Sequence, residues 1–314
     1  MKERREKRRG TLYLIRYWQL YVMLGIPLLY FLLFKYVPMF GNVLAFRRYR
    51  PGMGPYGTEW VGLTYFRRFW NDPAFWRAFR NTLVLSLINL VINFPIPIIF
   101  AILLNEVRIA PFKRLVQTVS YMPRFISTVV VIAILGELLS PSTGIFNILR
   151  QQWFGLPPIY FMNEEKYFRT IYILIDTWQY TGWTAIIYLA AITSIPPDLY
   201  ESAALDGASR WQVFLHIGLP MSKPIIVYTA LTAFIAPWTD FIFSGIILSS
   251  SGNAKTYTIA YGLYNMVHAT KGTSTTYFTW FIAGCVVIAV PITILFIIMQ
   301  KFYVNGITAG ADKG

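Results

Sequence analysis

Long apolar stretches alternate with shorter polar segments along this chain. Six of these stretches hold about twenty mostly apolar residues, the length that an α-helix needs to cross the hydrocarbon core of a bilayer. They cover residues 17–37, 82–104, 115–139, 171–195, 225–248 and 277–302. The pattern therefore predicts an all-α membrane protein with six transmembrane helices. Prolines inside several stretches indicate kinked helices, which are tolerated where neighbouring helices or cavity water satisfy the freed carbonyls.

The loop at 41–81 is too long for a simple turn. It contains LTYFRRFWNDPAFWRAFRNT, in which aromatic residues and arginines recur at helical intervals. Asp72 and Pro73 have the character of a helix N-cap followed by a first-turn proline. We expect an amphipathic helix on the outer membrane surface, with an ordinary solvated loop as the alternative.

A second unusual connection is PPDLYESAALDGASRWQVFLHIGLP, residues 196–220, which lies between two predicted crossings. Asp198 can cap a first short helix, Asp206-Gly207 indicates a turn, and Ser209 can cap a second helix that Pro220 ends. Both helices carry apolar residues that water cannot solvate well: Leu199, Ala203, Ala204, Trp211, Phe214 and Leu215. A helix–turn–helix of this kind fits a groove on another protein.

Composition supports a polytopic membrane protein. Of the 314 residues, 56% are hydrophobic and only 13% are charged, about half the share of a soluble protein. The net charge of +14 is concentrated in residues 1–16 and in the loop at 41–80. This distribution favours contact with anionic lipid headgroups and argues against nucleic acid as a partner.

The orientation in the membrane depends on the N-terminus. Lys and Arg are nearly balanced between the two sides, but seven of them lie within residues 1–16, directly before the first crossing. Such a dense cluster usually remains inside the cell, so we expect both termini in the cytoplasm and the 196–223 loop with them. No small-residue cleavage site follows the first apolar stretch, so we interpret it as a retained helix rather than a signal peptide.

The sequence offers no catalytic or metal-binding constellation. It has one cysteine, Cys285, and two histidines, so neither a disulfide within the chain nor a Cys/His metal cluster is expected. It contains no G-x-x-x-x-G-K-[ST] phosphate-binding loop. We therefore predict no catalytic residue, no metal and no cofactor bound by this chain.

Polar and aromatic residues inside the crossings are candidates for a substrate pathway, because ionisable groups at membrane depth are costly. They are Asp176, Trp178, Gln179, Tyr180, Trp183, Trp238, Thr239, Asp240 and, after Pro123, Arg124. Aromatic faces can stack on apolar faces of a solute, and polar side chains can hydrogen-bond to its hydroxyl groups. Alternatively, each tryptophan is a packing or interfacial residue, and Arg124 pairs with an aspartate in a purely structural contact.

At YESAALDGASRWQVFLHIGLP the chain resembles a known family. The chain follows, with one offset alanine, the E-A-A-x(3)-G-x(9)-I-x-L-P spacing of permease subunits in bacterial ATP-binding-cassette importers, at Glu201, Ala203, Gly207, Ile217, Leu219 and Pro220. The form YEAA-x-x-DGA is typical of the carbohydrate-uptake branch, and here Ser202 replaces the first alanine. KYVPMFGNVLAF and FKRLVQTVSYMPRFISTVVV are similar to polysaccharide-type permeases, whereas QKFYVNGITAGADKG resembles a maltose-type tail.

The resemblance implies a type I, binding-protein-dependent importer with a cytoplasmic coupling loop. Its partners would be a second permease, an ATPase dimer that carries ATP and Mg, an extracytoplasmic solute-binding protein, and a sugar, in the bacterial cytoplasmic membrane. The implied domains are an N-tail at 1–16, a permease domain at 17–302 and a C-tail at 303–314. The implied ATPase contacts are Tyr200, Glu201, Ser202, Ala203, Ala204, Asp206, Gly207 and Ala208, with Asn305, Gly306 and Gly310 of the tail.

Two other functional classes are weighed against this one. An ion-gradient-driven transporter or channel would not need an apolar helix–turn–helix at 196–220 in the cytoplasm. The six apolar stretches also show no obvious inverted repeat. An intramembrane enzyme ranks last, because the sequence has no paired protease-type aspartates, Ser/His dyad or metal-ligand cluster.

Overall fold

The computed structural model of the chain describes residues 16–50, 52–251, 254–268 and 275–311, with their side chains except at 249–251, 254, 275–276 and 303–311. These residues are largely helical, and they form no strand beyond one isolated bridge between Arg47 and Trp60. The predicted all-α class is confirmed. Most of the expected N-tail, residues 1–15, lies outside the described part of the chain.

The chain forms two compact units, residues 1–68 with 272–286, and residues 69–271 with 287–314. The first unit contains α2 (Trp18–Phe31), the π-helix η1 (Leu32–Tyr36), α3 (Val37–Met39) and the 3-10 helix η2 (Phe40–Ala45). Two helices have residues in both units, α4 (Thr64–Asn71) and α17 (Thr275–Ala311).

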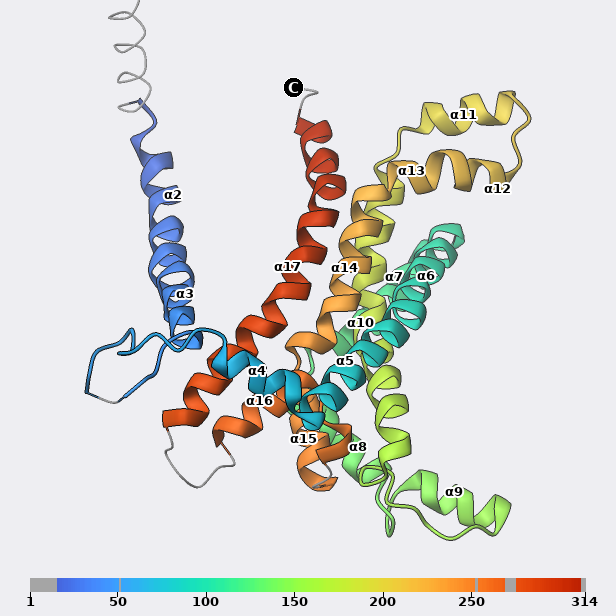
Figure 1. Cartoon of the computed structure of the whole chain (residues 1–314). Helices are drawn as coiled ribbons and strands as arrows, with labels where there is room; N and C mark the ends of the chain where they lie inside the picture. The colour runs from blue at the N-terminus through green and yellow to red at the C-terminus, as the bar shows by residue number, and fades with distance from the viewer. Residues whose placement is uncertain (1–15, 51, 252–253, 269–274, 312–314) are drawn as a thin grey trace, which may run out of the picture. The chain divides into compact units, whose positions relative to one another are not determined.

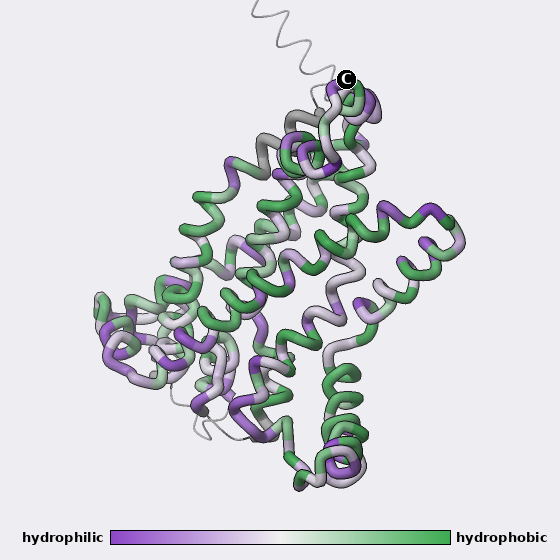
Figure 2. The backbone as a smooth tube through the Cα atoms, turned by 90° about the vertical axis from the view of Figure 1, so that its right-hand side faces the viewer, coloured by the Kyte–Doolittle hydropathy of each residue, from purple (hydrophilic) through white to green (hydrophobic). Residues whose placement is uncertain are grey.

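The remaining helices belong to the second unit. In chain order they are α5 (Pro73–Ile92), α6 (Pro95–Glu106), α7 (Ala110–Tyr121), η3 (Met122–Phe125), α8 (Thr128–Leu138), α9 (Ile145–Phe154), α10 (Glu165–Thr193), α11 (Pro197–Leu205), α12 (Arg210–Val213), η4 (Phe214–Gly218), α13 (Leu219–Met221), α14 (Lys223–Thr239), α15 (Ile242–Ser251), η5 (Ala254–Thr256) and α16 (Ile259–His268). Within this unit, α11 and α12 lie at one end, and α8, α9 and α15 lie towards the other (Figure 1). Hydrophobic residues run along much of the helices, whereas many hydrophilic residues lie in the connecting loops (Figure 2).

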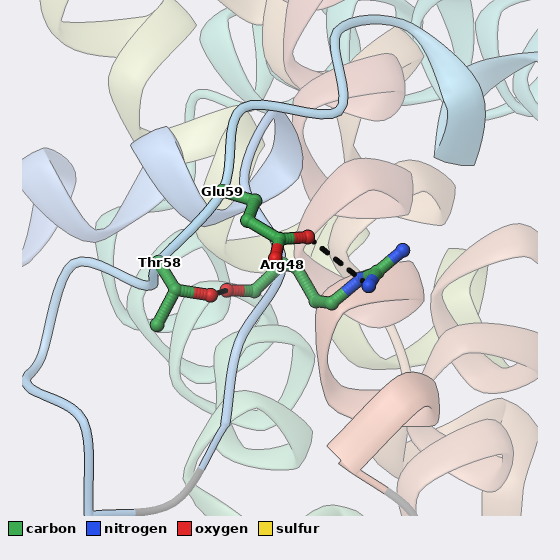
Figure 3. A network of polar contacts seen from close by, with 3 residues as sticks. All are labelled: Arg48, Thr58 and Glu59. Atoms are coloured by element: carbon green, nitrogen blue, oxygen red, sulfur yellow. Dashed lines mark hydrogen bonds and ion pairs between the residues drawn. The ribbon is translucent and has the colours of Figure 1, made fainter.

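In the first unit, helix α2 buries none of its residues within the chain. An apolar helix exposed on every face is stable in lipid or against another protein rather than in water. The loop that follows is closed by polar contacts (Figure 3). Arg48 and Glu59 form an ion pair of 3.1 Å, and the carbonyl of Arg48 accepts bonds from the Thr58 N–H at 2.8 Å and hydroxyl at 3.2 Å.

The predicted cap at Asp72-Pro73 is confirmed. Asp72 Oδ1 accepts the N–H of Ala74 at 2.8 Å, and Pro73 is the first residue of α5. The extent of this helix differs from the expectation. We expected a separate amphipathic helix before the crossing at 82–104, whereas α5 runs without interruption from Pro73 to Ile92. The aromatic residues before and after the cap, Trp70 and Trp76, pack edge to face with ring centroids 4.9 Å apart. A position on the membrane surface stays a prediction.

Helix α10 is the central helix of the second unit. Its first half packs in a core with residues of α5, α8 and α15: Leu85, Ile132, Phe168, Ile171, Tyr172, Phe243 and Ile247. Its second half lies directly against the end of α7 at Gly182, where an added Cβ would lie 2.1 Å from the carbonyl oxygen of Ser120. Only glycine permits this approach of two helices, since a methyl group there would overlap backbone atoms.

The prediction of six continuous crossings is only partly supported. By length and composition, the described residues contain three helical segments that can cross a membrane, Trp18–Ala45, Pro73–Glu106 and Tyr277–Phe302, or up to five if each of two bent pairs is one span. Helix α10 has 29 residues, about 43 Å at 1.5 Å per residue, yet it does not meet the same criterion. The reason is a stripe of polar residues along it, described below, which lowers its hydropathy.

Two predicted crossings, 115–139 and 225–248, are broken in the structure. Helices α7 and α8 meet at 97° around the 3-10 turn that contains Pro123. Helix α14 ends at Thr239, after Pro237, and the separate helix α15 begins at Ile242. In both places a proline removes a backbone donor, and a polar residue then caps the next helix, Ser127 for α8 and Asp240 for α15.

Candidate functional site

The second unit encloses a cavity of about 380 Å³ between α5, α10 and α14. We call it the central cavity. Its walls are unusually polar for a protein built of apolar helices, with three tyrosines and several amide and hydroxyl groups. The lining residues are Asn89, Asn93, Phe94, Thr128, Tyr172, Asp176, Gln179, Tyr180, Thr184, Tyr188, Thr229, Thr232, Ala233, Ala236, Thr239, Asp240 and Phe243.

One stripe of α10 supplies five of the lining residues, as many as α14 does. Tyr172, Asp176, Tyr180, Thr184 and Tyr188 follow at intervals of four residues and all line the central cavity. Residues at this spacing lie on one face of a helix. The three phenol rings alternate with smaller polar groups, so the wall offers both flat aromatic surfaces and hydrogen-bonding groups.

Asp176 is held in place by an amide from α5. The Nδ2 of Asn93 donates to Asp176 Oδ2 at 2.6 Å and also to Oδ1 of Asn89, and the hydroxyl of Thr177 donates to Asn93 Oδ1. These contacts fix which way the Asn93 amide points. They also join α10 to the break between α5 and α6, because Asn93 is the first residue after α5.

Asn89 compensates for a proline in the facing helix. Its Nδ2 donates to the carbonyl of Ala233 in α14 at 2.8 Å, and Asn89 is 1% exposed. In a regular helix, that carbonyl would accept the N–H of the residue four positions later, which here is Pro237 and has none. The side chain from α5 therefore replaces the missing backbone donor, as buried carbonyls at membrane depth require.

Asp240 lines the central cavity, but its oxygens are already used. Oδ1 accepts the N–H of Phe243 at 3.0 Å, and Oδ2 accepts the N–H and the hydroxyl of Ser244 at 3.1 and 2.9 Å. The Asp240 side chain thus caps the start of α15 from two residues before the helix, a structural role that its place before a helix could have indicated.

The other predicted pathway residues divide into two groups. Gln179, Tyr180 and Thr239 line the cavity with Asp176, and Gln179 Nε2 also donates to the carbonyl of Ile126 at 2.9 Å. The three tryptophans do not line it. Trp238 is 3% exposed and packs edge to face on Phe79 at 5.4 Å, whereas Trp178 and Trp183 are exposed.

Arg124 does not pair with either aspartate. Its guanidinium lies 4.9 Å from the ring centroid of Tyr180, and neither Asp176 nor Asp240 is within ion-pair distance of it among the described residues. The side chain is exposed, because α7 and α8 turn sharply around it. The predicted intramembrane Arg–Asp pair is therefore not formed in this structure.

Sequence reasoning missed several wall residues, namely Asn89, Asn93, Thr128, Tyr172, Thr184, Tyr188, Thr229 and Thr232. A signal was available for two of them, since Asn89 and Asn93 are polar residues four apart in an otherwise apolar stretch. Threonines and tyrosines in apolar helices carry a weaker signal, because they pack in ordinary cores as well.

The second candidate site is the α11–α13 segment, residues Pro197–Met221. As predicted, Ser209 caps its second helix in a full capping box: its hydroxyl accepts the N–H of Gln212 at 3.3 Å, and its own N–H donates to Gln212 Oε1 at 2.7 Å. Asp198 does not cap the first helix, because that helix begins one residue earlier and Pro196 occupies the N-cap position. Pro220 does not end the segment either, since α13 continues to Met221 before the chain bends by 73° into α14.

The turn of this segment requires glycine for its backbone conformation. Gly207 has a φ of +72°, and nothing lies within 4 Å of the place where a Cβ would be. Around the turn, apolar residues project into open space: Leu205 is 89% exposed and Trp211 is 67% exposed. Of the eight predicted contact residues, Ala203 is buried, Tyr200 and Ala208 are half-buried, and Glu201, Ser202, Ala204, Asp206 and Gly207 are exposed.

A groove of about 560 Å³ lies beneath the α11–α13 segment, against α6 and α10. Tyr188 lines both this groove and the central cavity, and its hydroxyl shares a hydrogen bond with Thr229 of α14. The end of α17 approaches from another direction, with the Lys223 ammonium 5.0 Å from the ring of Phe302. Asn305, Gly306 and Gly310 follow in α17, with side chains outside the described set.

Three comparisons with known proteins agree with one another. Residues 74–308 match the protein family described as binding-protein-dependent transport system inner membrane component. The chain is 49% identical, over 71% of its length and 70% of the relative's, to the polygalacturonan/rhamnogalacturonan transport system permease protein YteP of Bacillus subtilis (strain 168). A solved structure of a bacterial alginate ABC transporter, in complex with an alginate pentasaccharide-bound periplasmic protein, matches with a TM-score of 0.77 at 34% identity, over 92% of this chain and 94% of that one.

A second structure of a bacterial ABC transporter, involved in the import of the acidic polysaccharide alginate, matches equally well. Its TM-score is 0.77 at 32% identity, over 95% of this chain and 99% of that one. Among the described residues, no three His, Cys, Asp or Glu side chains are grouped so that they could hold a metal ion. By sequence and by fold, the chain belongs to the binding-protein-dependent transport system inner membrane components and is a multi-pass permease subunit of an ABC importer.

Proposed function

We propose that this chain is one of two permease subunits that together carry an oligosaccharide or polysaccharide fragment through the central cavity, driven by an ATPase dimer at the α11–α13 segment. An extracytoplasmic solute-binding protein delivers the cargo. The observation that carries the proposal is the presence, in one compact unit, of a polar cavity among apolar helices and an apolar surface on an exposed helical hairpin. The chain itself binds no cofactor, and ATP and Mg belong to the ATPase.

The cargo class follows from the wall of the cavity. Tyr172, Tyr180 and Tyr188 line the cavity together with amides and threonine hydroxyls, and of the three rings that of Tyr180 is exposed. Sugars combine apolar C–H faces with rings of hydroxyls, so they fit such a surface better than an ion or a lipid does. The names of similar proteins, which concern polygalacturonan, rhamnogalacturonan and alginate, point to the same class of cargo.

Coupling to the ATPase is assigned to the exposed α11–α13 segment. Leu205 and Trp211 would enter a groove of the ATPase, and Glu201, which is exposed on α11, would pair with a basic residue there. Gly207 permits the turn that presents both helices. Because Tyr188 lines both the groove under the hairpin and the cavity, a displacement of the hairpin is transmitted directly to the cavity wall.

The orientation proposed for the second unit places the α11–α13 segment in the cytoplasm. The contact of Lys223 with Phe302 brings the end of α17 to the same side as the start of α14, so the C-terminal tail would face the ATPase too. Asn305, Gly306 and Gly310 are proposed as its contacts. The N-terminal tail, with its cluster of basic residues, is also placed in the cytoplasm.

The proposal is tested by purifying the complex through a tag on this chain and measuring ATP-dependent sugar uptake in vesicles. The Glu201→Arg variant should lose the co-purified ATPase and its uptake, because it places a cation against the expected basic partner. Glu164→Arg, an equally exposed charge reversal before α10 at the opposite end of the unit, is the matched control and should keep both. Uptake that survives Glu201→Arg and needs no ATP would overturn the proposal and favour an ion-gradient-driven transporter.

A further inference from the structure

The charged groups of the central cavity are of one sign. Among its lining residues are two carboxylates, Asp176 and Asp240, and there is no lysine, arginine or histidine. Arg124 lies over the ring of Tyr180, which lines the cavity, but its own side chain is exposed and does not line the cavity. An anionic ligand in this wall would thus meet carboxylates and neutral dipoles only.

The two carboxylates differ in what they leave available. Both oxygens of Asp240 accept hydrogen bonds from Phe243 and Ser244 at the start of α15. Asp176 accepts one hydrogen bond, from Asn93 to Oδ2, and the described residues place no donor on Oδ1. A carboxylate oxygen without a donor is a strong acceptor where water is scarce, and it requires a partner.

The position of this oxygen is set by the surrounding protein. Asn93 cannot turn its amide away from Asp176, because its own oxygen accepts the hydroxyl of Thr177 and its nitrogen also binds Asn89. Asn89 is in turn fixed by the carbonyl of Ala233. The Asp176 carboxylate is therefore a preorganised acceptor rather than a mobile side chain.

From this arrangement we propose that Asp176 determines specificity by selecting a neutral sugar unit at its place in the cavity. Its Oδ1 accepts a hydrogen bond from a ring hydroxyl, while the exposed ring of Tyr180, one turn away, contacts an apolar face of the saccharide. A uronate carboxylate at the same place is rejected by like charge. The inference rests on the proposed function and narrows it, and it sets this chain apart from the similar transporters whose names specify acidic polysaccharides.

A matched pair of probes tests this selection. α-1,4-linked galactotriose and trigalacturonate differ only at C6, which is the carbon of a hydroxymethyl group in the first sugar and of a carboxylate in the second. Their dissociation constants are measured by saturation-transfer NMR on the solubilised transporter complex without its binding protein, so that the binding protein's own selectivity does not enter. We expect the wild-type complex to bind galactotriose at least about tenfold more tightly than trigalacturonate.

The variant Asp176→Asn keeps the size of the side chain and the bond from Asn93, but removes the charge. We expect the preference to fall to within about threefold, through weaker binding of galactotriose and tighter binding of trigalacturonate. Asp72→Asn is the control, since asparagine caps helices as well as aspartate and Asp72 lies outside the cavity; the preference should not change.

Three results overturn the inference: equal binding of both sugars by the wild type, a preference that Asp176→Asn leaves unchanged, or no binding of either sugar. These results are distinguishable from failure of the proposed function. If ATP-dependent uptake of saccharides in vesicles persists while the preference is absent, only the role of Asp176 is wrong. If no saccharide is taken up by a complex that retains its ATPase, the proposed function itself is wrong.

Discussion

The central cavity and the α11–α13 segment belong to the same unit, but they place polar and apolar side chains in opposite ways. The cavity buries Asn89 and half-buries Asn93 and Asp176, each with a named hydrogen-bond partner. The α11–α13 segment leaves Leu205 and Trp211 exposed, with no core to cover them. A polar group that is costly to bury points to a ligand with complementary groups, and an apolar group that is costly to expose points to a protein partner.

The two regions also differ in what holds them together. The cavity wall is fixed by close helix packing and by side-chain bonds between helices, whereas the exposed segment depends on its own caps and on one glycine turn. Substitutions in the wall should therefore reduce the stability of the whole chain. Substitutions in the segment should reduce association with the proposed ATPase partner and leave folding largely unchanged.

The largest effect is expected at Gly182. In Gly182→Ala the added methyl would lie 2.1 Å from the carbonyl oxygen of Ser120, and backbone atoms cannot yield as a flexible side chain can. We expect the free energy of unfolding to fall by about 3 kcal/mol or more, measured as the loss of monodisperse protein and of the thermal transition. Gly136→Ala in α8, where nothing lies within 4 Å, should be stable, and a stable Gly182→Ala would show that α7 and α10 are not closely packed.

The next largest effect is expected at Leu205, and it should appear in binding rather than in stability. Leu205→Asp places a charge where an apolar contact with the ATPase is proposed, so affinity should fall by about 2 kcal/mol or more. The melting temperature should not change, because the side chain is 89% exposed. Co-purification of the ATPase and calorimetry of the free chain measure the two effects. Leu156 is also exposed but lies outside the α11–α13 segment, so Leu156→Asp should alter neither ATPase binding nor the melting temperature. A lower melting temperature of Leu205→Asp would contradict the difference between the segment and the cavity wall.

A moderate effect is expected at Asn89. Asn89→Ala leaves the carbonyl of Ala233 without a donor, which should cost about 1–3 kcal/mol of unfolding free energy. The role of Asn89 as a substitute for the missing N–H of Pro237 is tested by a double-mutant cycle. In a Pro237→Ala background the helix regains its own donor, so Asn89→Ala should cost less there. Equal costs in both backgrounds would show that the proline and the asparagine are independent.

The smallest effect is expected at Ser209. Ser209→Ala removes one half of the capping box, worth about 1 kcal/mol, from a helix of four regular residues. The loss should appear as faster hydrogen exchange confined to residues 210–218, with little change in the global transition. Ser209→Thr should restore protection, because threonine keeps the hydroxyl. A global loss of stability in Ser209→Ala would mean that the segment contributes to the core.

Patterns confined to a few neighbouring residues predicted local structure well. Asp72-Pro73, Asp206-Gly207 and the Ser209 cap all appear as expected, because turns and caps are decided by the residues that form them. The prediction that Asp198 caps α11 was wrong for a local reason as well, since Pro196 and Pro197 allow the helix to begin earlier. Apolar stretches likewise indicated the helices, but not where they break, as at Pro123 and Asp240.

The cavity residues were predicted less completely, and the tryptophans show why. Trp178, Trp183 and Trp238 have the chemistry of sugar-binding residues, but their directions depend on helix rotation and on neighbours that are distant in the chain. Trp238 faces Phe79 of α5, about 160 positions away. The residues that do form the wall, such as Asn89 and Thr229, are brought together only when three helices pack.

By itself, the amino-acid sequence determined that this protein is an all-α membrane protein with an exposed apolar hairpin, because hydrophobic length, capping and turn chemistry are local properties. Only the tertiary structure decided which polar groups meet: Asn93 with Asp176, Asn89 with the carbonyl that Pro237 leaves unpaired, and Arg124 with Tyr180 instead of an aspartate. The physical reason is that a buried polar group must find its partner across helices, and helix rotation and spacing result from the packing of the whole unit, including a single close approach at Gly182.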